Sequence, residues 1–207
     1  MVSWSDLLTL LFASVVVLYA SASRNGFPSA HPKTVVKPQT AVNVPPPRRP
    51  ETQTGDDLTG PFQRLRDSLR NEIAEGKLQV LLETRGIVVS LRDQSSFTSG
   101  SDEIQPSALN SIGEVASIIR ELPNSVRLEG HTDSVPIHNA RFRDNWSLSA
   151  ARSAAVLGLL ESRFGIPAMR LAIAAYADNR PAAENESAEG RARNRRVDIV
   201  ILSQRNI

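Results

Sequence analysis

The chain has no cysteine, which excludes disulfide bridges, thiolate catalysis and cysteine-ligated metal sites. Histidine is also scarce, with three in 207 residues. His131 and His138 lie near Asp133 in the sequence, but no pair of histidines has the spacing of two zinc ligands on one helix. The sequence therefore predicts no metal site and no cofactor.

Neither a glycine-rich phosphate loop nor a nucleophile-elbow motif is present, so nothing in the sequence indicates an enzyme. Basic residues barely outnumber acidic ones, 24 against 22, and no concentrated basic stripe typical of a nucleic-acid binder occurs. The nearest approach is a group of arginines at 191–196, which runs into an alternating strand pattern. We therefore expect no nucleic-acid partner.

The first 23 residues form an apolar segment in which Asp6 is the only charged side chain. As a helix, residues 2–22 would be about 31 Å long, close to the thickness of a bilayer core. The sequence thus predicts a transmembrane helix at 1–23. A cleaved signal peptide is the alternative, since Ala20-Ser21-Ala22 resembles a cleavage site, although no Lys or Arg precedes the apolar run.

Both interpretations place the rest of the chain outside the cytoplasm, whereas the positive-inside rule favours the opposite orientation, because basic residues follow the apolar run and none precedes it. Residues 24–60 hold seven of the thirteen prolines and one aromatic residue, Phe27. Such a composition predicts a disordered, extended linker, with a reach on the order of 100 Å.

Residues 61–207 are expected to fold. Helical spacing predicts a linker helix at 61–82, followed by a domain at 83–207. Within this domain β-rich runs predict strands at 86–91, 126–130, 171–176 and 197–202, and the intervening patterns predict helices at 106–122 and 145–164. The order β-α-β-α-β-β predicts an α+β fold, with helices packed on a mixed sheet.

Two polar segments are candidates for a binding site. One is the loop that carries Asp133 after the strand at 126–130, and the other opens the helix at 145–164. Asn145 is expected to be the N-cap of this helix, with Ser149 and Arg152 on the same helical face. A carboxylate opposite an arginine can hold a ligand with both an ammonium and a carboxylate, such as the diaminopimelate side chain of peptidoglycan. A plain ion pair between Asp133 and Arg152 is the alternative.

Three motifs resemble the OmpA-like peptidoglycan-binding domain: Glu-Gly-His-Thr-Asp at 129–133, Asn-x-x-Leu-Ser-x-x-Arg at 145–152 and Asn-Arg-Arg-Val-Asp at 194–198. The resemblance covers roughly residues 83–203. It implies that Asp133 and Arg152 bind diaminopimelate of the stem peptide and that Arg196 lies beside them. The residues expected at the peptidoglycan site are Thr132, Asp133, Asn145, Leu148, Ser149, Arg152 and Arg196.

A narrower resemblance is to the flagellar stator B subunit, the MotB family. The Asn145-Trp146 pair, the loop at 134–144 and the segment Trp-Ser-Asp-Leu-Leu-Thr-Leu-Leu-Phe-Ala at 4–13 carry it. It implies a single-pass protein of the bacterial inner membrane with its C-terminal domain in the periplasm. Asp6 would be the proton carrier, and the partners would be a second copy and a multi-span, MotA-like channel subunit.

An acid in a membrane helix is costly and usually functional, which agrees with this role for Asp6. Small and polar residues at 6, 9, 13 and 20 lie near one helical stripe, which permits close helix contact. Little room remains for the amphipathic plug helix of flagellar stators, and residues 62–73 are a candidate substitute. A passive membrane-to-wall anchor, or a stator-type motor of a non-flagellar system for defence or envelope energetics, remain alternatives.

Overall fold

The computed structural model describes residues 57–203, which belong to a compact unit bounded by Arg49 and Ile207. Asp6, the expected membrane helix and nearly all of the expected linker lie outside the described residues. Within 57–203, no helix combines the length and the apolar character that a membrane span requires.

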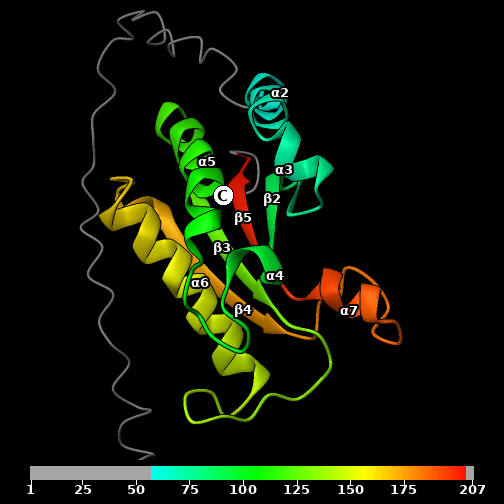
Figure 1. Cartoon of the computed structure of the whole chain (residues 1–207). Coiled ribbons are helices and arrows are strands. Elements are labelled where there is room, and N and C mark those ends of the chain that lie inside the picture. The colour runs from blue at the N-terminus through cyan, green and yellow to red at the C-terminus, as the bar shows by residue number, and fades with distance from the viewer. Residues whose placement is uncertain (1–56, 204–207) are drawn as a thin grey trace, which may run out of the picture. The chain divides into compact units, whose positions relative to one another are not determined.

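A five-stranded mixed sheet is the centre of the fold, in the order β1-β2-β5-β3-β4 (Figure 1). Its strands are β1 (Leu78–Glu83), β2 (Gly86–Arg92), β3 (Val126–His131), β4 (Leu171–Ala177) and β5 (Arg196–Leu202). All neighbouring pairs are antiparallel except β3 and β4, which are parallel and are joined through a helix. The prediction of a mixed sheet with packed helices is confirmed.

The expected linker helix at 61–82 is wrong in its second half. Helix α2 (Thr59–Ser68) and the short α3 (Arg70–Ala74) are followed by strand β1, so the sheet begins before residue 83. Gly76 ends the helical segment with a φ of 69°, a left-handed conformation that glycine adopts without a steric penalty. Leu65 and Leu69 are fully buried in the core, so residues 62–73 form part of this domain.

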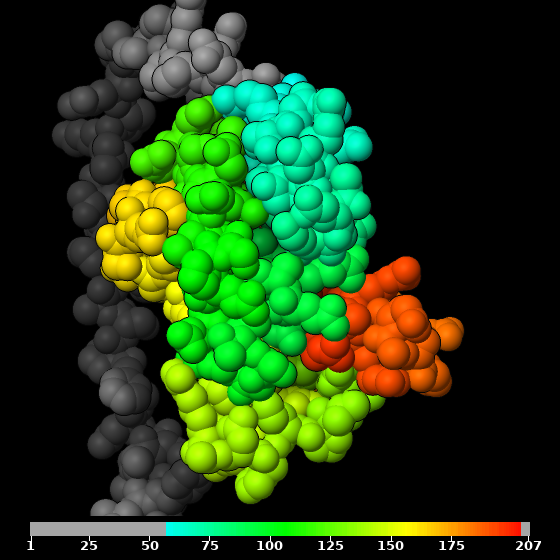
Figure 2. Space-filling view, viewed as in Figure 1, coloured from blue at the N-terminus to red at the C-terminus, as the bar shows by residue number. Residues whose placement is uncertain are grey.

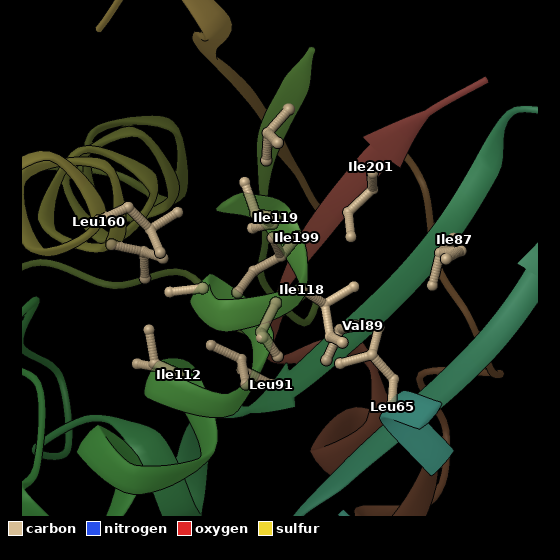
Figure 3. Packing of buried hydrophobic residues seen from close by; sticks show 14 of the residues in the cluster. Leu65, Ile87, Val89, Leu91, Ile112, Ile118, Ile119, Leu160, Ile199 and Ile201 are labelled. Atoms are coloured by element: carbon tan, nitrogen blue, oxygen red, sulfur yellow. The ribbon is translucent and has the colours of Figure 1, made fainter. Parts of the chain in front are cut away.

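The hydrophobic core lies between one face of the sheet and helices α2, α5 (Leu109–Glu121) and α6 (Asn145–Ser162) (Figures 1 and 3). Helix α5 follows a 3-10 turn that begins at Pro106, as the proline predicts, and α6 leads into β4 through a second 3-10 turn (Ala168–Arg170). In β5, Val197, Ile199 and Ile201 point to this core because alternate residues of a strand face the same side. The core formed by the described residues lies within the unit Arg49–Ile207, so a fragment with these bounds contains it.

Two short helices complete the order of elements, and the sequence pattern did not predict them. Helix α4 (Asp93–Ser96) follows β2 directly, and α7 (Ala188–Asn194) precedes β5. Figure 2 shows the α7 segment (orange) projecting at the edge of the molecule, beside the loop that follows β3 (yellow-green). The predicted order β-α-β-α-β-β therefore omitted three elements of the structure: strand β1, helix α4 and helix α7.

Candidate functional site

A pocket of about 590 Å³ opens where the loop after β3, the start of α6, helix α4 and the α7–β5 junction meet. We call it the loop pocket. Five of the seven residues predicted from the sequence line it: Thr132, Asp133, Asn145, Leu148 and Arg152. The structure thus brings the first two sequence motifs together at one cavity.

Close contact between β3 and α6 joins these motifs. A Cβ at Gly130 would overlap the carbonyl oxygen of Ser149, so only glycine permits the strand to approach the helix this closely. The Ser149 side chain is fully buried, and its hydroxyl donates to the carbonyl of Trp146 and accepts from the N–H of Ala177. Ser149 fixes the helix to the sheet and does not line the loop pocket.

Asn145 was expected to cap helix α6, and this is wrong by one residue. Asp144 is the N-cap, and it forms a capping box in which its carboxylate accepts from the N–H of Ser147 and its own N–H donates to the Ser147 hydroxyl. The first of these hydrogen bonds is also the main reason why the pKa of Asp144 lies below its usual value.

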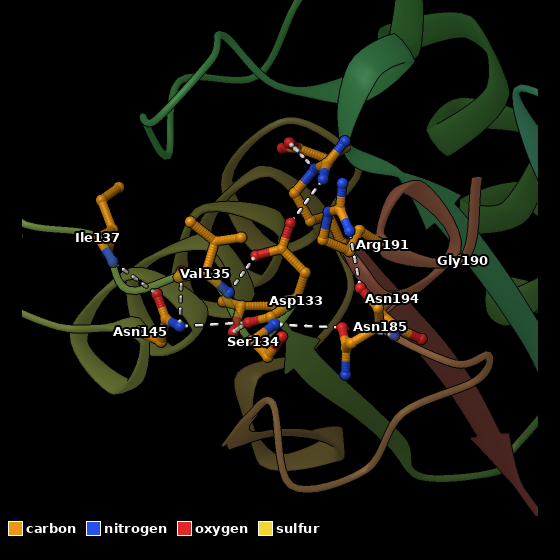
Figure 4. A network of polar contacts seen from close by, with 12 residues as sticks. Asp133, Ser134, Val135, Ile137, Asn145, Asn185, Gly190, Arg191 and Asn194 are labelled. Carbon is orange, nitrogen blue, oxygen red and sulfur yellow. Dashed lines mark hydrogen bonds and ion pairs between the residues drawn. The ribbon is translucent and has the colours of Figure 1, made fainter. Parts of the chain in front are cut away.

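Asn145 instead organises the loop that carries Asp133 (Figure 4). Its Nδ2 donates to the carbonyls of Asp133 and Val135 at 3.2 and 3.1 Å, and its Oδ1 accepts from the N–H of Ile137 at 3.2 Å. The Asp133 Oδ1 accepts in turn from the N–H of Val135. One amide side chain therefore satisfies three backbone groups of a loop that has no regular hydrogen-bonding pattern of its own.

Asp133 and Arg152 do not form the direct ion pair considered from the sequence. Arg152 Nη2 lies 2.6 Å from Asp93 Oδ1, and Arg195 Nη1 lies 2.6 Å from Asp133 Oδ2. Arg195 Nε completes the chain at 3.5 Å from Asp93 Oδ2. The four groups alternate in charge, in the order Arg152, Asp93, Arg195, Asp133, and all four line the loop pocket.

Burial dominates the electrostatics of this chain of charges. The Arg152 side chain is only 3% exposed; its Nε donates to the carbonyl of Ser101, and its guanidinium lies over the Phe97 ring. Burial raises the pKa of Asp93 above its usual value, and the nearby Arg152 and Arg195 offset part of this effect. Burial likewise lowers the pKa of Arg152, which Asp93 partly offsets. Because little solvent reaches Arg152 and Asp93, the contact between their charges is screened less than one at the surface.

The arginine of the third motif at this pocket is Arg195, whereas the sequence interpretation named Arg196. Arg196 lies outside the loop pocket and forms an ion pair with Asp198, with 3.1 Å between Nε and Oδ2. Alternation along β5 explains the difference, because Arg195 has the parity of the helix-facing Val197 and Arg196 has the parity of Asp198 on the opposite face.

Asn194, the first residue of this motif, does not line the pocket but connects its neighbouring loops through hydrogen bonds (Figure 4). It is fully buried, its Oδ1 accepts from the N–H groups of Ala182 and Ala183, and its Nδ2 donates to Asn185. Asn185 Oδ1 accepts from the N–H of Ser134, beside Asp133. Sequence reasoning missed Asp93 and Arg195 at the pocket, together with this amide network.

A buried cluster of Glu129, His131 and Asp198 on the opposite sheet face has the ligand types of a metal site. Its carboxylates are already engaged: Glu129 accepts from Arg85 and Arg127 at 2.5 and 2.6 Å, and Asp198 pairs with Arg196. Because guanidinium groups neutralise both acids, the cluster needs no cation, and a metal would have to displace an arginine.

Comparison with known proteins assigns this arrangement to a family. Residues 96–195 match the OmpA family. The cell wall anchor of the T6SS from Pseudomonas aeruginosa is similar at a TM-score of 0.63 and 34% identity, covering 68% of this chain and 98% of that chain. The fold and the match define an OmpA-family domain.

Similarity to one group of these proteins extends over nearly the whole chain. Motility protein B of Bacillus subtilis (strain 168) is 29% identical over 234 residues, which cover 98% of this chain and 89% of that protein. The periplasmic domain of Helicobacter pylori MotB has a TM-score of 0.56 and 28% identity, covering 61% of this chain and 80% of that chain. The chain belongs to the MotB family.

Proposed function

We propose that this chain is a peptidoglycan-anchored, proton-conducting stator subunit of a membrane motor. Its C-terminal domain binds diaminopimelate of the cell wall at the loop pocket, and Asp6 carries the proton. The observation that carries the proposal is the convergence of Asp133, Arg152 and Asn145, which come from two separate motifs, on one cavity.

The alternating charges of the loop pocket suit a zwitterionic ligand end. The guanidinium groups of Arg152 and Arg195 are donors for a carboxylate, and the carboxylates of Asp133 and Asp93 are acceptors for an ammonium group. The end of a diaminopimelate side chain carries one group of each sign, so it enters without leaving an unpaired charge. A lysine in the same position of the stem peptide lacks the carboxylate and leaves a guanidinium group without a ligand partner.

The proposal assigns the loop pocket to binding rather than catalysis, and it requires no cofactor. Both carboxylates of the pocket are held by arginines, and both oxygens of Asp133 accept hydrogen bonds from protein donors. Because protein donors already engage both oxygens of Asp133, neither oxygen is free of a partner and directed at a reacting group.

The motor role rests on family membership and on the acid in the N-terminal apolar segment. In this proposal residues 1–23 cross the bacterial inner membrane, the linker at 24–60 reaches towards the wall, and the pocket-bearing domain is periplasmic. Two copies and a multi-span, MotA-like channel subunit surround the path of the proton. A charged residue in a membrane helix is rarely retained without such a role.

A second candidate is a wall anchor without proton conduction, or one that serves a machine other than the flagellum. The similarity to the cell wall anchor of the T6SS from Pseudomonas aeruginosa favours it. Asp6→Asn separates the two candidates, because asparagine has nearly the shape of aspartate and does not ionise. For the motor, this variant keeps wall binding and loses proton conductance, while Asp6→Glu retains part of it. Full conductance in Asp6→Asn would make the passive anchor the better account.

Pull-down with purified peptidoglycan tests the wall-binding part of the proposal. In the Arg49–Ile207 fragment, Asp133→Ala should lose binding while its far-UV circular dichroism stays native. Asp178→Ala is the matched control, because Asp178 is an exposed acid outside the loop pocket. Equal retention of both variants on peptidoglycan would show that the assigned pocket is wrong.

A further inference from the structure

A second pocket, of about 640 Å³, lies on the face of the sheet opposite the core. We call it the outer-face pocket. The end of β2, the start of β5 and helix α7 supply three of its residues: Arg92, Arg196 and Arg193. It is separate from the loop pocket, because Arg195 and Arg196 are neighbours in sequence and point to opposite faces of the sheet.

The arrangement of these arginines is costly by itself. Arg92 and Arg196 are direct cross-strand partners in the antiparallel β2–β5 pair, where like charges destabilise a sheet. Burial, together with repulsion from Arg193 and Arg196, holds the pKa of Arg92 below its usual value. An anion between these groups would relieve the repulsion.

Two of the three charges have no counter-charge in the part of the chain that the structure describes. Arg196 is paired with Asp198, and Arg85, at the same pocket, is paired with Glu83 and with Glu129. Within residues 57–203 no ion pair or hydrogen bond engages the guanidinium groups of Arg92 or Arg193. The pocket lining therefore carries four arginines against two acids, an excess of two positive charges.

The other part of the outer-face pocket is apolar. Leu81 and Val88, which are partners in the β1–β2 pair, line it together with Ile73 of α3. Val88 lies four residues before Arg92 on the same strand, a distance of about 13 Å at the usual rise of a strand. A ligand that fills the pocket thus has an anionic group at one end and an uncharged organic part at the other.

We propose that the outer-face pocket binds a phosphate ester, with its phosphate between Arg92, Arg193 and Arg196 and its organic part over Leu81 and Val88. A tetrahedral phosphate offers enough oxygens for three guanidinium groups, whereas a carboxylate has only two. The site is independent of the loop pocket and of peptidoglycan binding.

The test is a titration of the isotope-labelled Arg49–Ile207 fragment with glycerol phosphate and with inorganic phosphate, followed by NMR at constant ionic strength. We expect saturable shifts at Arg92, Arg193 and Arg196, with tighter binding of the ester. Arg92→Gln or Arg193→Gln should weaken binding at least about tenfold, and the double variant more. Arg120→Gln is the matched control, since it removes the same charge from an exposed position on α5.

The double variant should still bind peptidoglycan, which separates this site from the loop pocket. Absence of saturable shifts, or equal affinity of the double variant and Arg120→Gln, would overturn the proposal. Sedimentation with vesicles containing phosphatidylglycerol then identifies the source of the ester. Loss of vesicle binding in the double variant assigns the phosphate to a lipid headgroup, and vesicle binding that is unchanged or absent assigns it to a soluble ester.

Discussion

In the proposed function, Arg152 has two separable roles, in ligand binding and in the stability of the domain. Arg152→Ala should lower the free energy of unfolding of the Arg49–Ile207 fragment by about 3–5 kcal/mol, because it removes one partner of a buried ion pair. The side chains of Arg152 and Asp93 are 3% and 11% exposed, so solvent does little to screen the charge that remains. Arg195 Nε still lies 3.5 Å from Asp93 Oδ2 and partly compensates the charge of Asp93. We therefore expect a loss of free energy near the lower end of this range.

The matched test adds Asp93→Asn in the same chain, which removes the charge that Arg152→Ala leaves behind. The double variant should be less destabilised than the sum of the single variants by about 1–3 kcal/mol, as for coupled residues in contact. Arg152→Ala should also abolish peptidoglycan binding, and the double variant should not regain it. Urea unfolding followed by far-UV circular dichroism gives the free energies, and pull-down of the same samples gives binding. Additivity within about 0.5 kcal/mol would refute the assignment of Asp93 as the counter-charge of Arg152.

Three further predictions concern residues that hold the loop of Asp133 in place or stabilise the sheet. Asn145→Ala should weaken peptidoglycan binding in pull-down while leaving the thermal midpoint nearly unchanged, because it releases the loop of Asp133 and leaves the core intact; native affinity would contradict this role. Gly130→Ala should destabilise the fragment in urea by about 3 kcal/mol or more, since the added Cβ meets the backbone of Ser149, which cannot move aside; a change below about 1 kcal/mol would show that the contact can relax. Burial raises the pKa of Asp198, but the contact with His131 and the charge of Arg196 lower it by more, so this pKa lies below its usual value. The Asp198 carboxylate therefore stabilises the fold above its pKa in the unfolded chain, and this stabilisation is lost as pH falls through its pKa in the folded protein. Urea unfolding measured across this pH range should show a free energy of unfolding that depends less on pH in Asp198→Asn.

Most of the sheet could be predicted from the sequence, because each of its last four strands, β2 to β5, has a β-rich run bounded by clear breaks. Strand β1 could not, since the helical spacing of Phe62, Leu65 and Leu69 leads up to it and its sequence, Leu-Gln-Val-Leu-Leu-Glu, does not alternate cleanly. Only the pairing of β1 with β2 determines its conformation, and tertiary contacts of this kind override local pattern.

The site was predicted in part, for a similar reason. Asp133 and Arg152 come from motifs with recognisable residue types, and the fold places both at the loop pocket. Strand parity, applied to the third motif, would have selected Arg195 in place of Arg196. Asp93 belongs to none of the motifs and lies forty residues before Asp133, so only the folded sheet reveals it as the link between Arg152 and Arg195.

Discrimination between two stem peptides tests the central claim most directly. The claim is that the loop pocket recognises the zwitterionic end of diaminopimelate. The measurement is the affinity of the Arg49–Ile207 fragment for a stem tripeptide that ends in meso-diaminopimelate and for the same peptide with lysine in its place. A charge-assisted contact contributes about 1.5–3 kcal/mol, so the diaminopimelate peptide should bind at least about tenfold more tightly. Equal affinity for the two peptides would contradict the account.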